Sequence, residues 1–304
     1  MKKKKIKPPA LNKGDRIAVV APAGLVERDV IEPAISILES WGLVVSRGDA
    51  LYERHGIFAG TDAQRMADLQ KALDDPGIKA IICARGGYGV SRIIRNINFR
   101  AFRKNPKWIV GYSDISVLHL FINCKLRIST LHGEMPLNYH KNEAGSATFV
   151  TLQKSLFDSP QDYEWNTGLS REGVAEGILT GGNLSLIINL MGTEIKKCLK
   201  GKILFIEERG EYFYSLDRMI TGLLLADVLE GLKGLIIGGL ADIKESYVKY
   251  ASGAADIIME SVSKYGYPVA FGFPAGHIRD NRALVLGAGI KLEVSDGIAG
   301  LQYL

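Results

Sequence analysis

Cysteine is scarce in this chain, and long hydrophobic runs are missing. The 304 residues include only three cysteines, Cys83, Cys124 and Cys198, which lie far apart in apolar contexts. Such a scattered, odd-numbered set is typical of reduced thiols in a protein core and of neither a disulfide framework nor a zinc site. No segment approaches the ~18 consecutive apolar residues of a membrane-spanning helix. We therefore expect no membrane span, no metal and no other cofactor.

A basic surface over the body of the chain is also missing. The formal net charge is +5, and the five lysines at residues 2–5 and 7 account for all of it. The remainder is close to neutral, so we expect no nucleic-acid partner. Polar residues and two prolines follow the lysines, and no apolar stretch like that of a signal peptide comes after them. We expect a solvated lysine tail on a cytoplasmic protein.

The first half of the chain alternates apolar strands with helical patterns. Composition is that of an ordinary soluble protein, with 47% hydrophobic and 23% charged residues, and 304 residues are long for one core. Strands are expected at residues 16–21, 43–46, 79–84 and 108–110. This alternation predicts a parallel sheet covered by helices on both faces, with ligands beyond the carboxyl ends of the strands.

The second half follows a change of composition between about residues 142 and 172, and a turn is expected at residues 180–183. Strands are expected at residues 174–179, 202–206 and 235–238, with a closing β region at residues 283–294. The predicted fold class is α/β. The expected domains are an N-terminal parallel-sheet domain of the flavodoxin or Rossmann type at residues 1–150, a linker at residues 151–173, and a C-terminal α/β domain of mixed sheet at residues 174–304.

One strand of the first half runs directly into a helix through Gly111-Tyr112-Ser113-Asp114. A serine at such a turn presents its hydroxyl beyond the sheet edge, beside unpaired N–H groups at the start of the helix. That geometry suits a nucleophile with part of an oxyanion hole. A plain helix N-cap is the alternative role for Ser113, and a common one.

The loop Gly86-Gly87-Tyr88-Gly89 follows another strand and reaches the same edge of the predicted sheet. Its N–H groups suit an oxyanion hole, and a simple turn explains the glycines equally well. The loop lacks the Lys-Ser/Thr ending of a P-loop and the G-x-G-x-x-G spacing of a dinucleotide site. A non-catalytic protein that binds a small nucleotide or sugar remains an alternative.

A histidine and a carboxylate complete the list of candidates. His277 lies in a glycine-flanked loop, which suits catalysis, and His132 at the end of a strand is its chief competitor. His119 is assigned a structural role, because its helix carries it away from Ser113. Glu207 directly follows strand 202–206 and is placed to orient a histidine, although a glutamate there is commonly a solvated loop residue.

Five blocks of sequence, in order, resemble the LD-carboxypeptidases, which include the microcin-immunity peptidases. The blocks cover residues 84–89, 111–114, 131–133, 207–218 and 276–281. The resemblance implies a serine peptidase in which Ser113 is the nucleophile, His277 the general base and then acid, and Glu207 its orienting partner. It further implies an oxyanion hole from the N–H groups of Gly87 and Asp114, a triad assembled from both domains, and a homodimer.

The activity that the resemblance implies is hydrolysis of an L,D peptide bond in a small peptide. Release of the terminal D-alanine of murein tetrapeptide in cytoplasmic cell-wall recycling is the main expectation, and a microcin-like peptide-nucleotide or acyl-sulfamate is the alternative substrate. A carboxypeptidase binds a free carboxylate, for which Arg85 and Arg279 are candidates by position. Glu208, Glu134 and Val285-Leu286 depart from the family's usual residues, and none removes a member of the triad.

Overall fold

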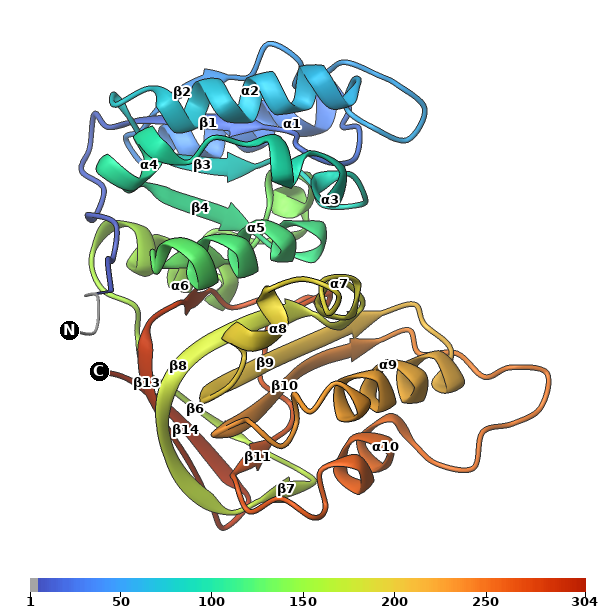
Figure 1. The fold of residues 1–304 in the computed structure, drawn as a ribbon. Helices are drawn as coiled ribbons and strands as arrows, with labels where there is room; N and C mark the ends of the chain where they lie inside the picture. Colours follow the sequence, from blue (N-terminus) through green and yellow to red (C-terminus); the bar gives the residue numbers. More distant parts are fainter. Residues whose placement is uncertain (1–4) are drawn as a thin grey trace. The chain divides into compact units, whose positions relative to one another are not determined.

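The computed structural model describes residues 5–304, which divide into two compact units. The first unit comprises residues 5–160 with Arg282–Val285, and the second comprises Gln161–Asn281 with Leu286–Leu304. Each unit has its own sheet with helices beside it, so the α/β fold class is confirmed (Figure 1). Most of the expected lysine tail lies outside the described residues. Among residues 5–304, no helix has the length and apolar character needed to cross a membrane.

The sheet of the first unit has six strands in the order β12-β5-β4-β3-β1-β2, and its pairs from β5 to β2 are parallel. Its strands are β1 (Arg16–Val20), β2 (Val44–Arg47), β3 (Ile78–Cys83), β4 (Trp108–Gly111), β5 (Thr130–His132) and β12 (Leu284–Leu286). The central strands β1, β3 and β4 are almost entirely buried and apolar, as a parallel sheet covered on both faces requires.

Helices pack on both faces of this sheet, with α1 and α2 on opposite sides (Figure 1). The helix α2 begins at a capping box in which the side chains of Thr61 and Gln64 each bond the other's backbone. The α-helices are α1 (Arg28–Ser40), α2 (Asp62–Asp74), α3 (Val90–Ile93), α4 (Arg100–Lys104), α5 (Ser116–Phe121) and α6 (Ala147–Phe157). Shorter 3-10 or π segments are η1 (Ile94–Asn96), η2 (Ser113–Ile115), η3 (Ile122–Leu126) and η4 (Pro136–Lys141).

The sheet of the second unit is mixed and has eight strands in the order β6-β14-β13-β8-β9-β10-β11-β7. The run from β8 to β11 is parallel, and the outer pairs are antiparallel. The strands are β6 (Tyr163–Asn166), β7 (Ser170–Arg171), β8 (Gly173–Asn183), β9 (Lys202–Arg209), β10 (Gly234–Ala241), β11 (Val269–Ala270), β13 (Gly289–Ser295) and β14 (Ile298–Tyr303). The helices are α7 (Leu184–Asn189), α8 (Ile195–Cys198), α9 (Phe213–Leu225) and α10 (Ala254–Ser261), of which α9 and α10 lie side by side (Figure 1).

Two segments differ from their expected secondary structure. Residues 151–173, expected as a linker, contain the end of α6 and the strands β6 and β7, and the side chains of Tyr163 and Trp165 in β6 are buried. The turn expected at residues 180–183 is instead the end of β8, which pairs with β9 as far as Asn183 opposite Glu207. Glycine makes this pairing possible, because a Cβ on Gly181 would collide with the backbone of Phe205.

The cysteines follow the sequence prediction only in part. Cys83 is a buried free thiol, as expected. Cys124 and Cys198 are half-buried, and neither is a free thiol, so the prediction of reduced core thiols is wrong for both. Both cysteines have apolar neighbours in the sequence, but neither lies in a core. Each is in a short helical segment and is followed or preceded directly by an exposed lysine, Lys125 or Lys197.

Candidate functional site

Ser113 lies two residues after the end of β4, in a strained backbone conformation. Its φ is 61°, in the left-handed region that residues with a Cβ seldom adopt. Such strain costs of order 1–3 kcal/mol and occurs preferentially at functional positions. The N-cap of the 3-10 turn η2 is Tyr112 rather than Ser113, so the alternative role of Ser113 as a plain N-cap is wrong.

The glycine loop after β3 packs against this serine. A Cβ built on Gly86 would lie 2.7 Å from Ser113 Cβ and 2.9 Å from Ser113 Oγ, so that no side chain fits there. Gly87 has a φ of 101°, which also favours glycine. The strands β3 and β4 are neighbours, and the loops that follow them meet at one edge of the sheet, as the sequence predicts.

Asp114 turns its side chain toward the start of α3. The carboxylate is fully buried, and its Oδ2 accepts a hydrogen bond of 2.8 Å from Val90 N–H. Burial raises the pKa of Asp114 to about 6, although the bond from Val90 and the charge of Arg65 act in the opposite direction. Sequence reasoning considered only the backbone N–H of Asp114 and missed this role of the side chain.

In the second unit, a buried carboxylate holds the imidazole of His277. Glu207, the sixth residue of β9, has no exposed surface. Its Oε2 lies 2.7 Å from His277 Nδ1 and also accepts a bond of 3.3 Å from His277 N–H. A carboxylate only accepts, so Nδ1 carries the proton and the neutral ring leaves Nε2 unprotonated. The structure thus brings Glu207 and His277 together in the arrangement that a general base requires.

The pKa of His277 reflects opposing influences. Burial by itself lowers the pKa, whereas the hydrogen bond and the charge of Glu207 raise it, and the charge of Glu208 adds to this effect. The net result is a pKa above the ordinary value of 6.5. The stabilised imidazolium is the form that a general base reaches after it takes a proton.

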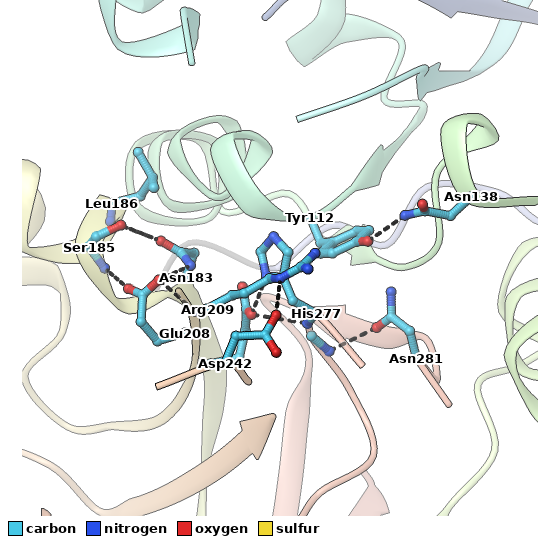
Figure 2. Close-up of polar contacts among 12 residues, drawn as sticks. Tyr112, Asn138, Asn183, Ser185, Leu186, Glu208, Arg209, Asp242, His277 and Asn281 are labelled. Carbon is cyan, nitrogen blue, oxygen red and sulfur yellow. Dashed lines mark hydrogen bonds and ion pairs between the residues drawn. The ribbon is translucent and has the colours of Figure 1, made fainter. Parts of the chain in front are cut away.

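The backbone around His277 is tightly constrained. Gly276 has a φ of 112°, and a Cβ built on it would lie 2.7 Å from Glu207 Cβ. Gly276 N–H donates a hydrogen bond of 2.9 Å to the buried Asn281 Oδ1 (Figure 2). These contacts explain why a glycine precedes the histidine and an asparagine follows four residues later.

Glu208 lies on the opposite face of β9 from Glu207 and anchors the start of α7. Its buried carboxylate accepts hydrogen bonds of 2.9 Å from Asn183 Nδ2 and 2.7 Å from Ser185 N–H (Figure 2). Asn183 is also the N-cap of α7. Sequence reasoning missed Asn183, and the pairing of β8 with β9 is what brings it to the residue beside Glu207.

The other histidines of interest are buried. The structural role of His119 is confirmed, because its ring has no exposed surface and its Nε2 donates a bond of 2.8 Å to Gly111 O. Burial lowers the pKa of His119 to about 4, so the ring is neutral. His132 is equally buried, with its ring centre 5.6 Å from that of Tyr112.

The two arginine candidates lie in different units. Arg85 is half-buried in the first unit, and its Nη1 donates a bond of 2.7 Å to Leu25 O, which fixes the guanidinium beside the glycine loop. Arg279 is exposed in the second unit, two residues after His277. Over residues 5–304, no three His, Cys, Asp or Glu side chains form a group that could hold a metal ion.

Comparison with known proteins gives matches over nearly the whole chain. Residues 17–133 match the LD-carboxypeptidase N-terminal domain, and residues 176–292 match the LD-carboxypeptidase C-terminal domain. The probable murein peptide carboxypeptidase of Bacillus subtilis is 33% identical over 300 residues, which cover 97% of this chain and 94% of that protein. The crystal structure of muramoyltetrapeptide carboxypeptidase from Oxalobacter formigenes has a TM-score of 0.86 at 27% identity, covering 95% of this chain and 98% of that one. The structure of MccF in complex with glutamyl sulfamoyl guanosine has a TM-score of 0.85 at 20% identity, covering 99% of both chains, a likeness of fold alone.

Proposed function

Since the chain belongs to the LD-carboxypeptidase family, we propose that it releases the terminal D-alanine of a murein tetrapeptide by serine-dependent hydrolysis. The murein peptide and muramoyltetrapeptide in the names of its relatives support this substrate class. The likeness to MccF concerns the fold alone, so a microcin-like substrate has less support.

The hydrogen bond between the buried Glu207 and the half-buried His277 is the observation that supports this mechanism most strongly. A carboxylate that fixes Nδ1–H of a histidine leaves Nε2 as the basic atom, which is the arrangement of catalytic triads on unrelated folds. We therefore propose that Ser113 is the nucleophile, that His277 is its general base and that Glu207 orients the imidazole. The strained turn of Ser113 supports the first of these roles.

In the first chemical step, Ser113 Oγ attacks the carbonyl carbon of the L,D peptide bond and gives its proton to His277 Nε2. The negative charge that develops on the carbonyl oxygen is stabilised by the N–H groups of Gly87 and Asp114. Donors of this kind are each worth about 10²–10³ in rate. The charge of Glu207 stabilises the imidazolium that forms in the same step.

The imidazolium then returns the proton to the leaving nitrogen, and D-alanine departs. The remaining peptide is held as an ester on Ser113. Water attacks this ester with His277 again as the base, and the same sequence of proton transfers releases the tripeptide.

A fixed arginine recognises the free carboxylate of the terminal D-alanine in this proposal. The hydrogen bond from Arg85 Nη1 to Leu25 O supports Arg85, because it holds the guanidinium in place. Arg279 is the second candidate, through its position beside His277. Arg85→Ala or Arg279→Ala should raise KM with a smaller effect on kcat, and unchanged KM and kcat in both variants would rule out both arginines.

We also propose that the protein acts on recycled cell-wall peptides in the cytoplasm as a homodimer without a metal. The resemblance to the family supports these points. Sedimentation of the purified protein tests the dimer, and retention of activity in EDTA tests the independence from metal.

The test of the function is direct. The wild-type protein is incubated with murein tetrapeptide in EDTA, and free D-alanine is followed with time. We expect steady release by the wild type and none by folded Ser113→Ala. Turnover of an aminoacyl-sulfamoyl nucleoside but not of the tetrapeptide would favour the alternative substrate, and release by Ser113→Ala at the wild-type rate would refute the mechanism.

A further inference from the structure

We propose that the side chain of Asp114 is a positioning residue that ties the glycine loop after β3 to the serine turn after β4. In this role it would fix the positions of the two N–H donors, Gly87 on the loop and Asp114 on the turn, with respect to Ser113. The inference rests on the proposed function, because it assigns Gly87 and Asp114 N–H to the oxyanion hole.

The first support is a contact that joins the two segments. Asp114 has no exposed surface, and its Oδ2 accepts the 2.8 Å bond from the N–H of Val90. Val90 is the first residue of α3 and comes directly after the loop of residues 86–89. The same residue therefore supplies one expected oxyanion donor through its backbone and holds the segment of the other donor through its carboxylate.

The second support is the close packing between the loop and the serine turn. A Cβ on Gly86 would lie 2.7 Å from Ser113 Cβ and 3.3 Å from the backbone nitrogen of Asp114. A loop that is no longer held at Val90 can move against these atoms. Displacements of about 1 Å at a catalytic group can cost about 10²-fold in rate.

The third support is a buried cation that lies against the loop. Arg65 of α2 is 1% exposed, and its Nη1 donates a bond of 2.8 Å to Pro22 O. A Cβ on Gly89 would collide with this guanidinium, so the loop lies directly against it. The charge of Arg65 favours the ionised form of Asp114. The Asp114 carboxylate, the glycine loop and the Arg65 guanidinium thus pack together as one cluster.

The first experiment compares three variants in the D-alanine assay. Asp114→Ala should lower kcat by about 10–100-fold and leave KM within threefold, because only the alignment of the oxyanion donors changes. Asp114→Asn should lower kcat by about 3–10-fold, because an amide oxygen still accepts the hydrogen bond from Val90 N–H but carries no charge. Asp68→Ala is the matched control.

Asp68 suits this purpose because it makes the same kind of contact elsewhere in the first unit. It is 6% exposed, and its carboxylate accepts bonds of 3.0 Å from Asp49 N–H and 2.8 Å from Ala50 N–H. Asp68→Ala should therefore lower stability as Asp114→Ala does, yet leave kcat within about threefold of wild type. A fall in kcat as large as that of Asp114→Ala would make the role of Asp114 merely structural and overturn the proposal.

The second experiment needs no substrate and measures amide hydrogen exchange over residues 84–93. Exchange should be faster in Asp114→Ala than in wild type and intermediate in Asp114→Asn. Unchanged exchange, or faster exchange with an unchanged kcat, would overturn the proposal. If Asp114→Ala does not fold, kcat and amide exchange of Asp114→Asn test the proposal instead.

The two proposals fail in different ways. A wild-type protein that releases no D-alanine refutes the proposed function, and the catalytic part of this inference falls with it. The exchange measurement then still decides whether Asp114 holds the loop.

Discussion

Replacement of Glu207 by glutamine tests the geometry of the second unit most sharply. In the wild type, Oε2 accepts from His277 Nδ1 at 2.7 Å, so the proton is on Nδ1 and Nε2 is the basic nitrogen of the ring. The glutamine amide can donate to Nδ1, which moves the proton to Nε2 and removes the basic atom. The substitution preserves size, so the buried position remains filled.

The magnitude follows from two contributions. A hydrogen bond to a charged group contributes about 1.5–3 kcal/mol, and each 1.36 kcal/mol is about tenfold in rate. Loss of that stabilisation of the imidazolium costs about 10–100-fold. The wrong tautomer adds to this loss, and the same change in a serine protease triad costs about 10⁴-fold. We expect Glu207→Gln to lower kcat by about 10²–10⁴-fold.

The pH dependence gives the prediction a second readout. Glu207 raises the pKa of His277, and a general base must be unprotonated, so activity rises with pH through this raised pKa. Removal of the charge lowers the pKa, and the acidic limb of kcat/KM should move to lower pH. The assay is D-alanine release from murein tetrapeptide over the pH range 5–9.

The control is Glu208→Gln at the next position. Glu208 is also buried and contributes charge at His277, but its hydrogen bonds go to Asn183, Ser185 and Arg209. We expect Glu208→Gln to lower kcat by less than about tenfold and to shift the acidic limb of kcat/KM only slightly. Glu207→Gln with at least a third of the wild-type kcat and an unchanged acidic limb would show that Glu207 does not orient His277. A large loss of kcat in Glu208→Gln alone would assign that role to Glu208.

Three further predictions concern packing and pH. Gly86→Ala should lower kcat at least tenfold, because its Cβ would lie 2.7 Å from Ser113 Cβ, and D-alanine release at the wild-type rate would contradict this contact. Gly276→Ala should destabilise the fold by about 1–3 kcal/mol in denaturant unfolding, since φ is 112° and the Cβ meets Glu207, and an unchanged midpoint would contradict it. The folded pKa of His277 lies above its unfolded value, so its pairing with Glu207 stabilises the fold fully below about pH 6.5 and loses this contribution as pH rises through the folded pKa. The difference in unfolding free energy between wild type and His277→Gln should therefore shrink from pH 5 to 9, and a difference that grows would contradict the sign.

The first unit was largely predictable because its elements are local patterns. The strands β1, β3 and β4 are runs of buried apolar residues, and α2 begins at the capping box of Thr61 and Gln64. Strand ends in a parallel sheet meet at one edge, which is why Gly86 and Ser113 could be placed together from sequence.

The second unit was less predictable because long-range pairing decides its structure. Two strands lie where a linker was expected, and β8 continues through an expected turn because Gly181 lets it approach Phe205. The pairing that results sets Asn183 opposite Glu207. No local sequence pattern predicts that Asn183 lies opposite Glu207. The hydrogen bond between Asp114 and Val90 is equally unpredictable, because it joins residues 24 positions apart.

In the proposed mechanism, His277 activates Ser113 as a nucleophile. A fluorophosphonate reagent followed by peptide mass spectrometry measures this directly. We predict a single adduct, on Ser113, that forms at least about 100-fold more slowly in folded His277→Ala. An adduct on another residue, or labelling of Ser113 at the same rate in wild type and His277→Ala, would contradict it.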